Sequence, residues 1–136
     1  MSDSGYARVT AQILEHSKRQ AKKGITFPVI GICRGAQMMM VVEAGKDFLI
    51  ETDALNLSLP LTFTKEASKS KLFGKAPKGL VCALKNEPIT FNAHALGIPS
   101  ESFYNNTDLT KAFRAISTNF DRNGTDFIST FEGMLP

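Results

Sequence analysis

The residue of this sequence best suited to covalent chemistry is Cys33, which stands between two glycines in Gly31-Ile32-Cys33-Arg34-Gly35. A side chain in that position fits a sharp turn from a strand into a helix, where bulky neighbours would collide and where its tip is exposed. The N-terminus of the following helix would favour the nucleophilic thiolate. We therefore predict a nucleophile at Cys33. The same pentapeptide is also compatible with a tightly packed turn around an inert, buried thiol.

The segments on either side of this cysteine favour the turn. Residues 25–33 form a nearly continuous apolar run, which is typical of a parallel strand covered by helices on both faces, and residues 36–44 are compatible with a helix. Upstream, residues 4–23 repeat apolar side chains at helical spacing, with Ser4 as a candidate N-cap and Gly24 at the position of a C′ glycine. This order of helix, strand, turn and helix predicts an α/β fold.

The rest of the sequence adds β-prone regions. Residues 55–62 alternate leucine with polar residues, which favours a half-buried strand, and residues 89–93 are a shorter strand candidate. Near the end, residues 113–121 and 125–132 flank Asn123-Gly124, a dipeptide that strongly indicates a hairpin turn. We expect a C-terminal β-hairpin there.

Composition limits the classes of function. The 136 residues fit one domain, residues 1–136, and 43% hydrophobic residues suffice for a core. No apolar run reaches the roughly 18–20 residues that span a bilayer, the start lacks a signal-peptide pattern, and the cysteines lack zinc-ligand spacing. We expect no membrane or nucleic-acid partner, no metal and no cofactor. The lysines of residues 65–79 are expected in a solvated loop, and Cys82 in a buried apolar run.

Four blocks of the sequence occur in an order known from one enzyme family: Phe27-Pro28-Val29-Ile30-Gly31-Ile32-Cys33-Arg34-Gly35, Leu57-Ser58-Leu59-Pro60-Leu61-Thr62-Phe63-Thr64, Glu87-Pro88-Ile89-Thr90-Phe91-Asn92-Ala93-His94 and Phe127-Ile128-Ser129-Thr130-Phe131-Glu132-Gly133. Together they resemble γ-glutamyl hydrolase, the folate polyglutamate hydrolase of the class I glutamine amidotransferase-like superfamily. The resemblance runs from about Ser4 onward. It implies a flavodoxin-like, three-layer α/β fold with a mostly parallel central sheet.

The resemblance also implies a reaction and its residues. A cysteine at the position of Cys33 attacks γ-glutamyl amides of folate poly-γ-glutamates and forms a thioester, without a cofactor. The backbone N–H of Arg34 would supply half of the oxyanion hole. His94 matches a family histidine beside the substrate, although an ordinary strand-end histidine also fits. The Arg34 side chain would clamp a substrate carboxylate or form a structural salt bridge.

The sequence departs from the family pattern in three respects. The family's catalytic histidine and its orienting carboxylate come from a Trp-His-Pro-Glu-like segment, and its second oxyanion donor from a Pro-Gly-Gly loop, neither of which occurs here. His16 offers no substitute, because it is expected on a solvated helix face. We therefore expect an incomplete domain that is feebly active alone. The Cys-Arg-Gly form at Cys33 differs from Cys-Leu-Gly, which leaves other γ-glutamyl amides open as substrates.

Two other interpretations remain open at this point. One is a pseudoenzyme that binds γ-glutamyl ligands or a homologous subunit, and the other is an unrelated α/β binding domain. A homodimer is a further expectation, and the family suggests a vacuolar, lysosomal or extracellular location. Asn56, Asn105 and Asn123 each fit the N-glycosylation pattern.

Overall fold

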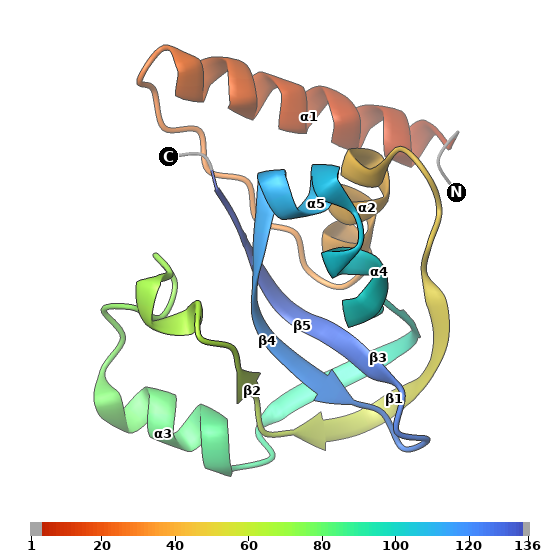
Figure 1. Cartoon of the computed structure of the whole chain (residues 1–136), viewed down its shortest axis with the longest axis vertical. Helices are drawn as coiled ribbons and strands as arrows, with labels where there is room; N and C mark the ends of the chain where they lie inside the picture. The colour runs from red at the N-terminus through yellow and green to blue at the C-terminus, as the bar shows by residue number, and fades with distance from the viewer. Residues whose placement is uncertain (1–3, 135–136) are drawn as a thin grey trace.

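The computed structural model describes residues 4–134 and combines helices with short antiparallel sheets (Figure 1). The elements in chain order are α1 (Gly5–Lys22), α2 (Arg34–Ala44), β1 (Ile50–Leu59), β2 (Thr62–Phe63), the 3-10 helix η1 (Ala67–Lys69), α3 (Lys78–Asn86), β3 (Thr90–Gly97), α4 (Ser100–Tyr104), α5 (Thr107–Ala112), β4 (Phe113–Phe120) and β5 (Asp126–Gly133).

Both sheets are antiparallel. One pairs β1 with β3, and the other has the order β2-β4-β5. The α/β class is thus confirmed. The prediction of a mostly parallel central sheet is wrong for the described residues, whose strand pairs are all antiparallel. The C-terminal hairpin is confirmed: β4 and β5 pair directly, and Gly124 adopts a φ of 79° in the turn that joins them.

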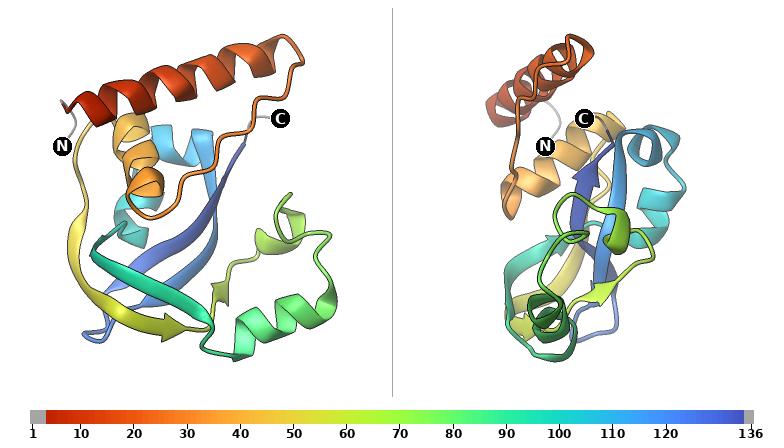
Figure 2. Two further views of the ribbon diagram at one scale, coloured as in Figure 1. Left: turned by 180° about the vertical axis from the view of Figure 1, so that it is seen from behind. Right: turned by 90° about the vertical axis from the view of Figure 1, so that its left-hand side faces the viewer.

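The apolar run before Cys33, which was predicted to be a parallel strand, explains why the expected parallel sheet is absent from the described residues. Residues 25–32 form neither helix nor strand and pair with none of the described strands, and they run over the outside of the molecule between α1 and α2 (Figure 2). Ile30 is 86% exposed and Ile32 81% exposed. A parallel strand needs neighbouring strands that are distant in sequence, so an apolar run does not become a strand by its own composition.

The first helix forms as expected. The Ser4 hydroxyl accepts a hydrogen bond from the Ala7 N–H at 3.1 Å, and Gly24 follows the helix with a φ of 73°. Lys18 of α1 forms an ion pair with Glu43 of α2, with Nζ 2.6 Å from Oε2. This pair helps to hold α1 across α2.

The core lies between α2 and the hairpin β4–β5, with α4 and α5 closing one side (Figure 1). Met39 and Met40 of α2 are buried against side chains of the other three elements, which include Phe103, Leu109, Phe113, Ala115 and Ile128. This packing fixes α2 relative to the strands, because five consecutive residues in the middle of the helix, 37–41, are buried.

Residues 65–86 differ from the expectation in their second half. The lysine-rich loop is present and contains η1, but the apolar run that follows forms helix α3. None of the α3 side chains is buried, and Cys82 is exposed. The predicted burial of Cys82 is therefore wrong. Apolar residues at helical spacing cover only one side of a helix, and here Leu80 is 49% exposed while Val81 and Cys82 line a cavity.

Candidate functional site

Cys33 lies at a strained turn directly before α2. Its backbone has a φ of 52° and a ψ of −113°, a conformation that residues with a side chain rarely adopt. Gly31 is required for the close approach in this turn, since a Cβ atom there would lie 2.6 Å from Met39 Sδ and 2.8 Å from the Ala36 nitrogen. Such strain is typical of a nucleophile held at the end of a sharp turn.

The start of α2 provides the electrostatic surroundings of this cysteine. Arg34 is the first residue of the helix, so its backbone N–H has no acceptor within the helix. The Cys33 side chain is exposed at the same end, where the helix dipole favours negative charge. The turn thus places the exposed Cys33 side chain next to a backbone N–H that is not used within the helix.

A side chain on α2 connects this turn to β3. The Gln37 amide donates a hydrogen bond from Nε2 to the Leu96 carbonyl at 2.7 Å, and Gln37 is buried. A cavity of about 370 Å³ opens between the turn, β3 and β5, and both Cys33 and His94 line it. The structure therefore brings together two site residues that are 61 positions apart in sequence, counted from 33 to 94.

His94 is held on several sides. Its Nδ1 lies 3.3 Å from the Thr52 hydroxyl and its Nε2 lies 3.2 Å from Asn92 Oδ1, while its ring packs edge-on against Phe127. The Asn92 amide donates to the Leu57 and Thr90 carbonyls, which directs its oxygen toward the imidazole.

This environment favours a neutral imidazole. Burial lowers the pKa of His94, and a backbone hydrogen bond with Leu96 opposes that shift only in part. A neutral ring that donates from Nε2 to Asn92 and accepts at Nδ1 from Thr52 satisfies both nitrogens. His94 is thus a fixed polar group in the wall of the cavity.

The arginine side chain lies outside this arrangement. Arg34 is exposed, and it is not among the residues that line the cavity. It makes no ion pair within residues 4–134, so the alternative of a structural salt bridge finds no support there. Arg34 directly follows Cys33 as the first residue of α2, and its roles in the oxyanion hole and in binding substrate stay predictions.

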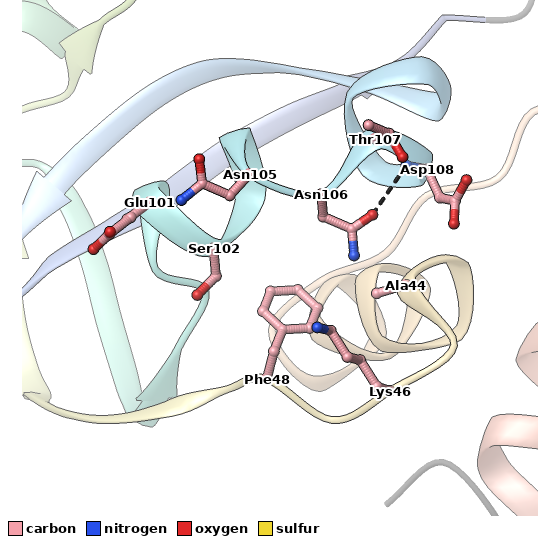
Figure 3. A pocket seen from close by; sticks show the side chains of 9 residues that line it. All are labelled: Ala44, Lys46, Phe48, Glu101, Ser102, Asn105, Asn106, Thr107 and Asp108. Carbon is pink, nitrogen blue, oxygen red and sulfur yellow. Dashed lines mark hydrogen bonds between the residues drawn. The ribbon is translucent and has the colours of Figure 1, made fainter.

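A second cavity, of about 560 Å³, lies at the other end of α2 (Figure 3). Phe48 and Lys46 form one side, and residues of α4 and α5 such as Glu101 and Asp108 form the other. The eleven residues of α2 separate it from Cys33, a length of about 16 Å at 1.5 Å per residue. Its polar groups therefore do not take part in chemistry at the cysteine.

The described part of the chain contains neither a metal-binding cluster nor a membrane-spanning helix. Among residues 4–134, no group of three or more histidine, cysteine or carboxylate side chains is arranged to hold a metal ion. The helices of this same region are all too short or too polar to cross a membrane.

Sequence reasoning missed the residues that position His94. Asn92 carried a usable signal, because alternate residues of a strand share a face and Asn92 stands two positions before His94. Thr52 and Phe127 carried no local signal, since they reach His94 from β1 and β5. His16 was expected to face solvent but is half-buried, with its ring 4.8 Å from that of Phe27.

Comparison with known proteins supports the resemblance seen in the sequence. No family model matches the chain. The chain is 36% identical to the γ-glutamyl hydrolase of Mus musculus over 133 residues, which are 98% of this chain and 42% of the mouse protein. It is 35% identical to the γ-glutamyl hydrolase of Bos taurus, over 96% of this chain and 41% of the bovine protein. It is 37% identical to γ-glutamyl hydrolase B of Dictyostelium discoideum, over 80% of this chain and 32% of that protein.

These alignments cover nearly all of the chain, including the turn at Cys33 and the strand that carries His94. The chain spans about two fifths of the length of its mammalian relatives. Over that length the relatives at 35–37% identity are all named γ-glutamyl hydrolase, which supports that family for this chain.

Proposed function

We propose that this protein acts in the cysteine-dependent hydrolysis of γ-glutamyl amide bonds, with Cys33 as the nucleophile and folate poly-γ-glutamates as the substrates. One observation carries the proposal: Cys33 is exposed at a strained turn, at the N-terminus of α2, in a cavity that it shares with His94. The family relationship supports the γ-glutamyl bond. The Cys-Arg-Gly sequence leaves other γ-glutamyl amides as the alternative substrate class.

The chemistry follows from this geometry. The Cys33 thiolate attacks the γ-carbonyl carbon, a C–S bond forms, and the carbonyl electron pair moves onto oxygen. The Arg34 N–H donates to that oxyanion, and one such donor contributes about 10² to 10³ in rate. The intermediate then breaks its C–N bond as a proton reaches the leaving amine, which yields a thioester. Attack by water breaks the C–S bond, releases the γ-carboxylate and restores the thiol.

We assign His94 to substrate positioning rather than to proton transfer. Both of its ring nitrogens already have partners, Thr52 and Asn92, so the ring is poorly placed to shuttle protons, and it acts instead through the shape of the cavity wall against which the substrate lies. In the family that the sequence resembles, the proton donor is a separate catalytic histidine in a Trp-His-Pro-Glu-like segment, and that segment does not occur in these 136 residues. We therefore propose that these 136 residues turn over slowly by themselves.

Covalent labelling tests the nucleophile without requiring turnover. A γ-glutamyl diazomethyl ketone alkylates a positioned thiolate with loss of N₂, and peptide mass spectrometry locates the adduct. We expect selective labelling of Cys33, which disappears in Cys33→Ala and persists in Cys82→Ala. The exposed Cys82 serves as an internal control. Equal labelling of the two cysteines, or equal hydrolysis of a γ-glutamyl peptide by the natural chain and Cys33→Ala, would reject the proposal.

A non-catalytic binding role is the second candidate. It is favoured by the occupied nitrogens of His94 and by the lack of any carboxylate side chain among the described residues that line the cavity. The same experiment separates the two roles. Binding alone predicts that a γ-glutamyl peptide slows labelling of Cys33 by competition while no peptide is cleaved, whereas catalysis predicts cleavage that depends on Cys33.

A further inference from the structure

A third cavity lies far from Cys33, between β2, the loop that contains η1, and α3. It has a volume of about 650 Å³, and none of its lining residues also lines the cavity of Cys33 and His94. Its elements lie at the end of the molecule opposite α1 (Figures 1 and 2). The volume lies within the range of about 300–1,000 Å³ that is usual for small-molecule sites.

The inner wall of this cavity is aromatic and aliphatic. Phe63 of β2 and Phe73 pack edge to face, with ring centroids 5.1 Å apart and ring planes at 73°. Ala76 and Val81 extend the apolar surface toward α3. A planar ring inserted here would add a further edge or face contact to this pair of phenylalanines.

Three lysines surround that apolar wall. Lys65 precedes η1, and Lys78 and Lys85 lie seven residues apart on α3, which places them on one face of the helix. No ion pair or hydrogen bond within residues 4–134 involves the ammonium group of any of the three, and no aspartate or glutamate is among the described residues that line the cavity. The lining of this cavity thus carries positive charge only.

We propose that this cavity binds a small aromatic carboxylate, with the ring against Phe63 and Phe73 and the carboxylates at Lys65, Lys78 and Lys85. The apolar wall and the cationic rim each match one part of such a ligand. This is a binding site separate from the reaction proposed at Cys33, so either proposal can fail without the other.

Cys82 provides a local reporter for occupancy, because it is exposed and lines this cavity, whereas Cys33 is exposed in the other one. The probe is isophthalate, an aromatic dicarboxylate without a glutamyl group, and its uncharged diamide is the matched control. Alkylation by iodoacetamide is followed at each cysteine by peptide mass spectrometry. We expect isophthalate to slow alkylation of Cys82 and to leave that of Cys33 unchanged.

Charge-removing variants complete the test. Lys78→Gln and Lys85→Gln should each weaken protection of Cys82 about fivefold, in line with the loss of one exposed ion pair. Lys111→Gln, on α5 and outside the cavity, should leave protection unchanged. These surface substitutions leave the fold intact, so failure to fold does not obscure the result. Protection of Cys33 instead of Cys82, equal protection by the diamide, or no protection at millimolar probe would overturn the proposal.

Discussion

The hairpin β4–β5 and the turn at Cys33 are both short motifs with clear sequence signals. All the expected elements of the hairpin form, whereas the expected strand before the turn does not. In the hairpin, both strands pair and their inner side chains are buried. On one side of the turn, the middle of α2 is buried. On the other side, the residues that lead into Cys33 include the exposed Ile30 and Ile32.

The difference shows how far a local signal reaches. The partners of a hairpin are neighbours in sequence, and here the Asp121 side chain also accepts hydrogen bonds from the Asn123 and Thr125 N–H groups in the turn. The Asp53 N–H of β1 donates to the same carboxylate, which links the two sheets. The apolar run before Cys33 depends on partners that are distant in sequence, so its composition alone does not form a strand.

The largest expected effect is in the hairpin. Phe127→Ala removes a buried ring that packs on His94 and should lower the free energy of unfolding by about 3–5 kcal/mol. Urea denaturation measures this. Phe120→Ala, on the same hairpin but exposed, is the matched control and should stay within about 0.5 kcal/mol. A loss below about 1 kcal/mol for Phe127→Ala would contradict a tightly packed hairpin.

The next effect tests the close approach at the turn. Gly31→Ala places a Cβ against the Ala36 backbone nitrogen and should lower the free energy of unfolding by about 1–3 kcal/mol. It should also slow diazomethyl ketone labelling of Cys33, because the turn must open. Gly79→Ala is the control, since a Cβ there meets nothing within 4 Å. Unchanged stability and labelling in Gly31→Ala would show that the turn is looser than described.

The hairpin also carries a pH-dependent ion pair. Burial would raise the pKa of Glu132, but the hydrogen bond and charge of Arg114, with the N–H groups of Leu72 and Lys71, outweigh burial and lower it. A lowered carboxyl pKa stabilises the fold above the ordinary value of 4.5, and this stabilisation is lost as the pH falls through the folded-state pKa.

Glu132→Gln should therefore lower the free energy of unfolding by about 1–3 kcal/mol at pH 7, with a smaller difference near pH 3. Glu15→Gln breaks an exposed pair with Arg19 and is the control, with an expected change within about 0.5 kcal/mol. Chemical denaturation across pH 3–7 provides the comparison. A difference for Glu132→Gln that stayed constant over this range would rule out the ion pair as its cause.

A smaller effect of opposite sign is expected at Cys33. Cys33→Gly relieves the positive φ and should raise the free energy of unfolding by about 1 kcal/mol while it abolishes labelling. Cys82→Gly, in the interior of α3, should lower the free energy of unfolding by about 0.3–0.5 kcal/mol. Thermal and urea unfolding of both variants measures the contrast. Destabilisation by Cys33→Gly would mean that the cysteine side chain contributes more than the strain removes.

The smallest effect is expected before the turn. Ile30→Ser should change the free energy of unfolding by less than about 0.5 kcal/mol, because the side chain is 86% exposed. Light scattering should also show less self-association, as a large exposed apolar group is removed. Ile116→Ser, in the buried centre of β4, provides the contrast with a large loss. A loss above about 1.5 kcal/mol for Ile30→Ser would show that this residue is covered in solution.

Local sequence signals predicted the first helix, the C-terminal hairpin and the sharp turn at Cys33. Ser4 and Gly24 correctly bounded α1, Asn123-Gly124 marked the hairpin turn, and the glycines around Cys33 marked the strained turn into α2. Each of these signals acts through the backbone of a few adjacent residues. The exposure of α3 was missed because apolar spacing alone does not show what lies opposite it.

What the sequence determined by itself is the conformation at Cys33 and the identity of the side chains available for chemistry, because turns, caps and glycine requirements are local. Only the tertiary structure decided that His94 shares a cavity with Cys33, that Thr52 and Asn92 hold its ring, and that the run before the cysteine stays unpaired within the described residues. Those outcomes depend on contacts between segments far apart in sequence, which packing and strand pairing select together.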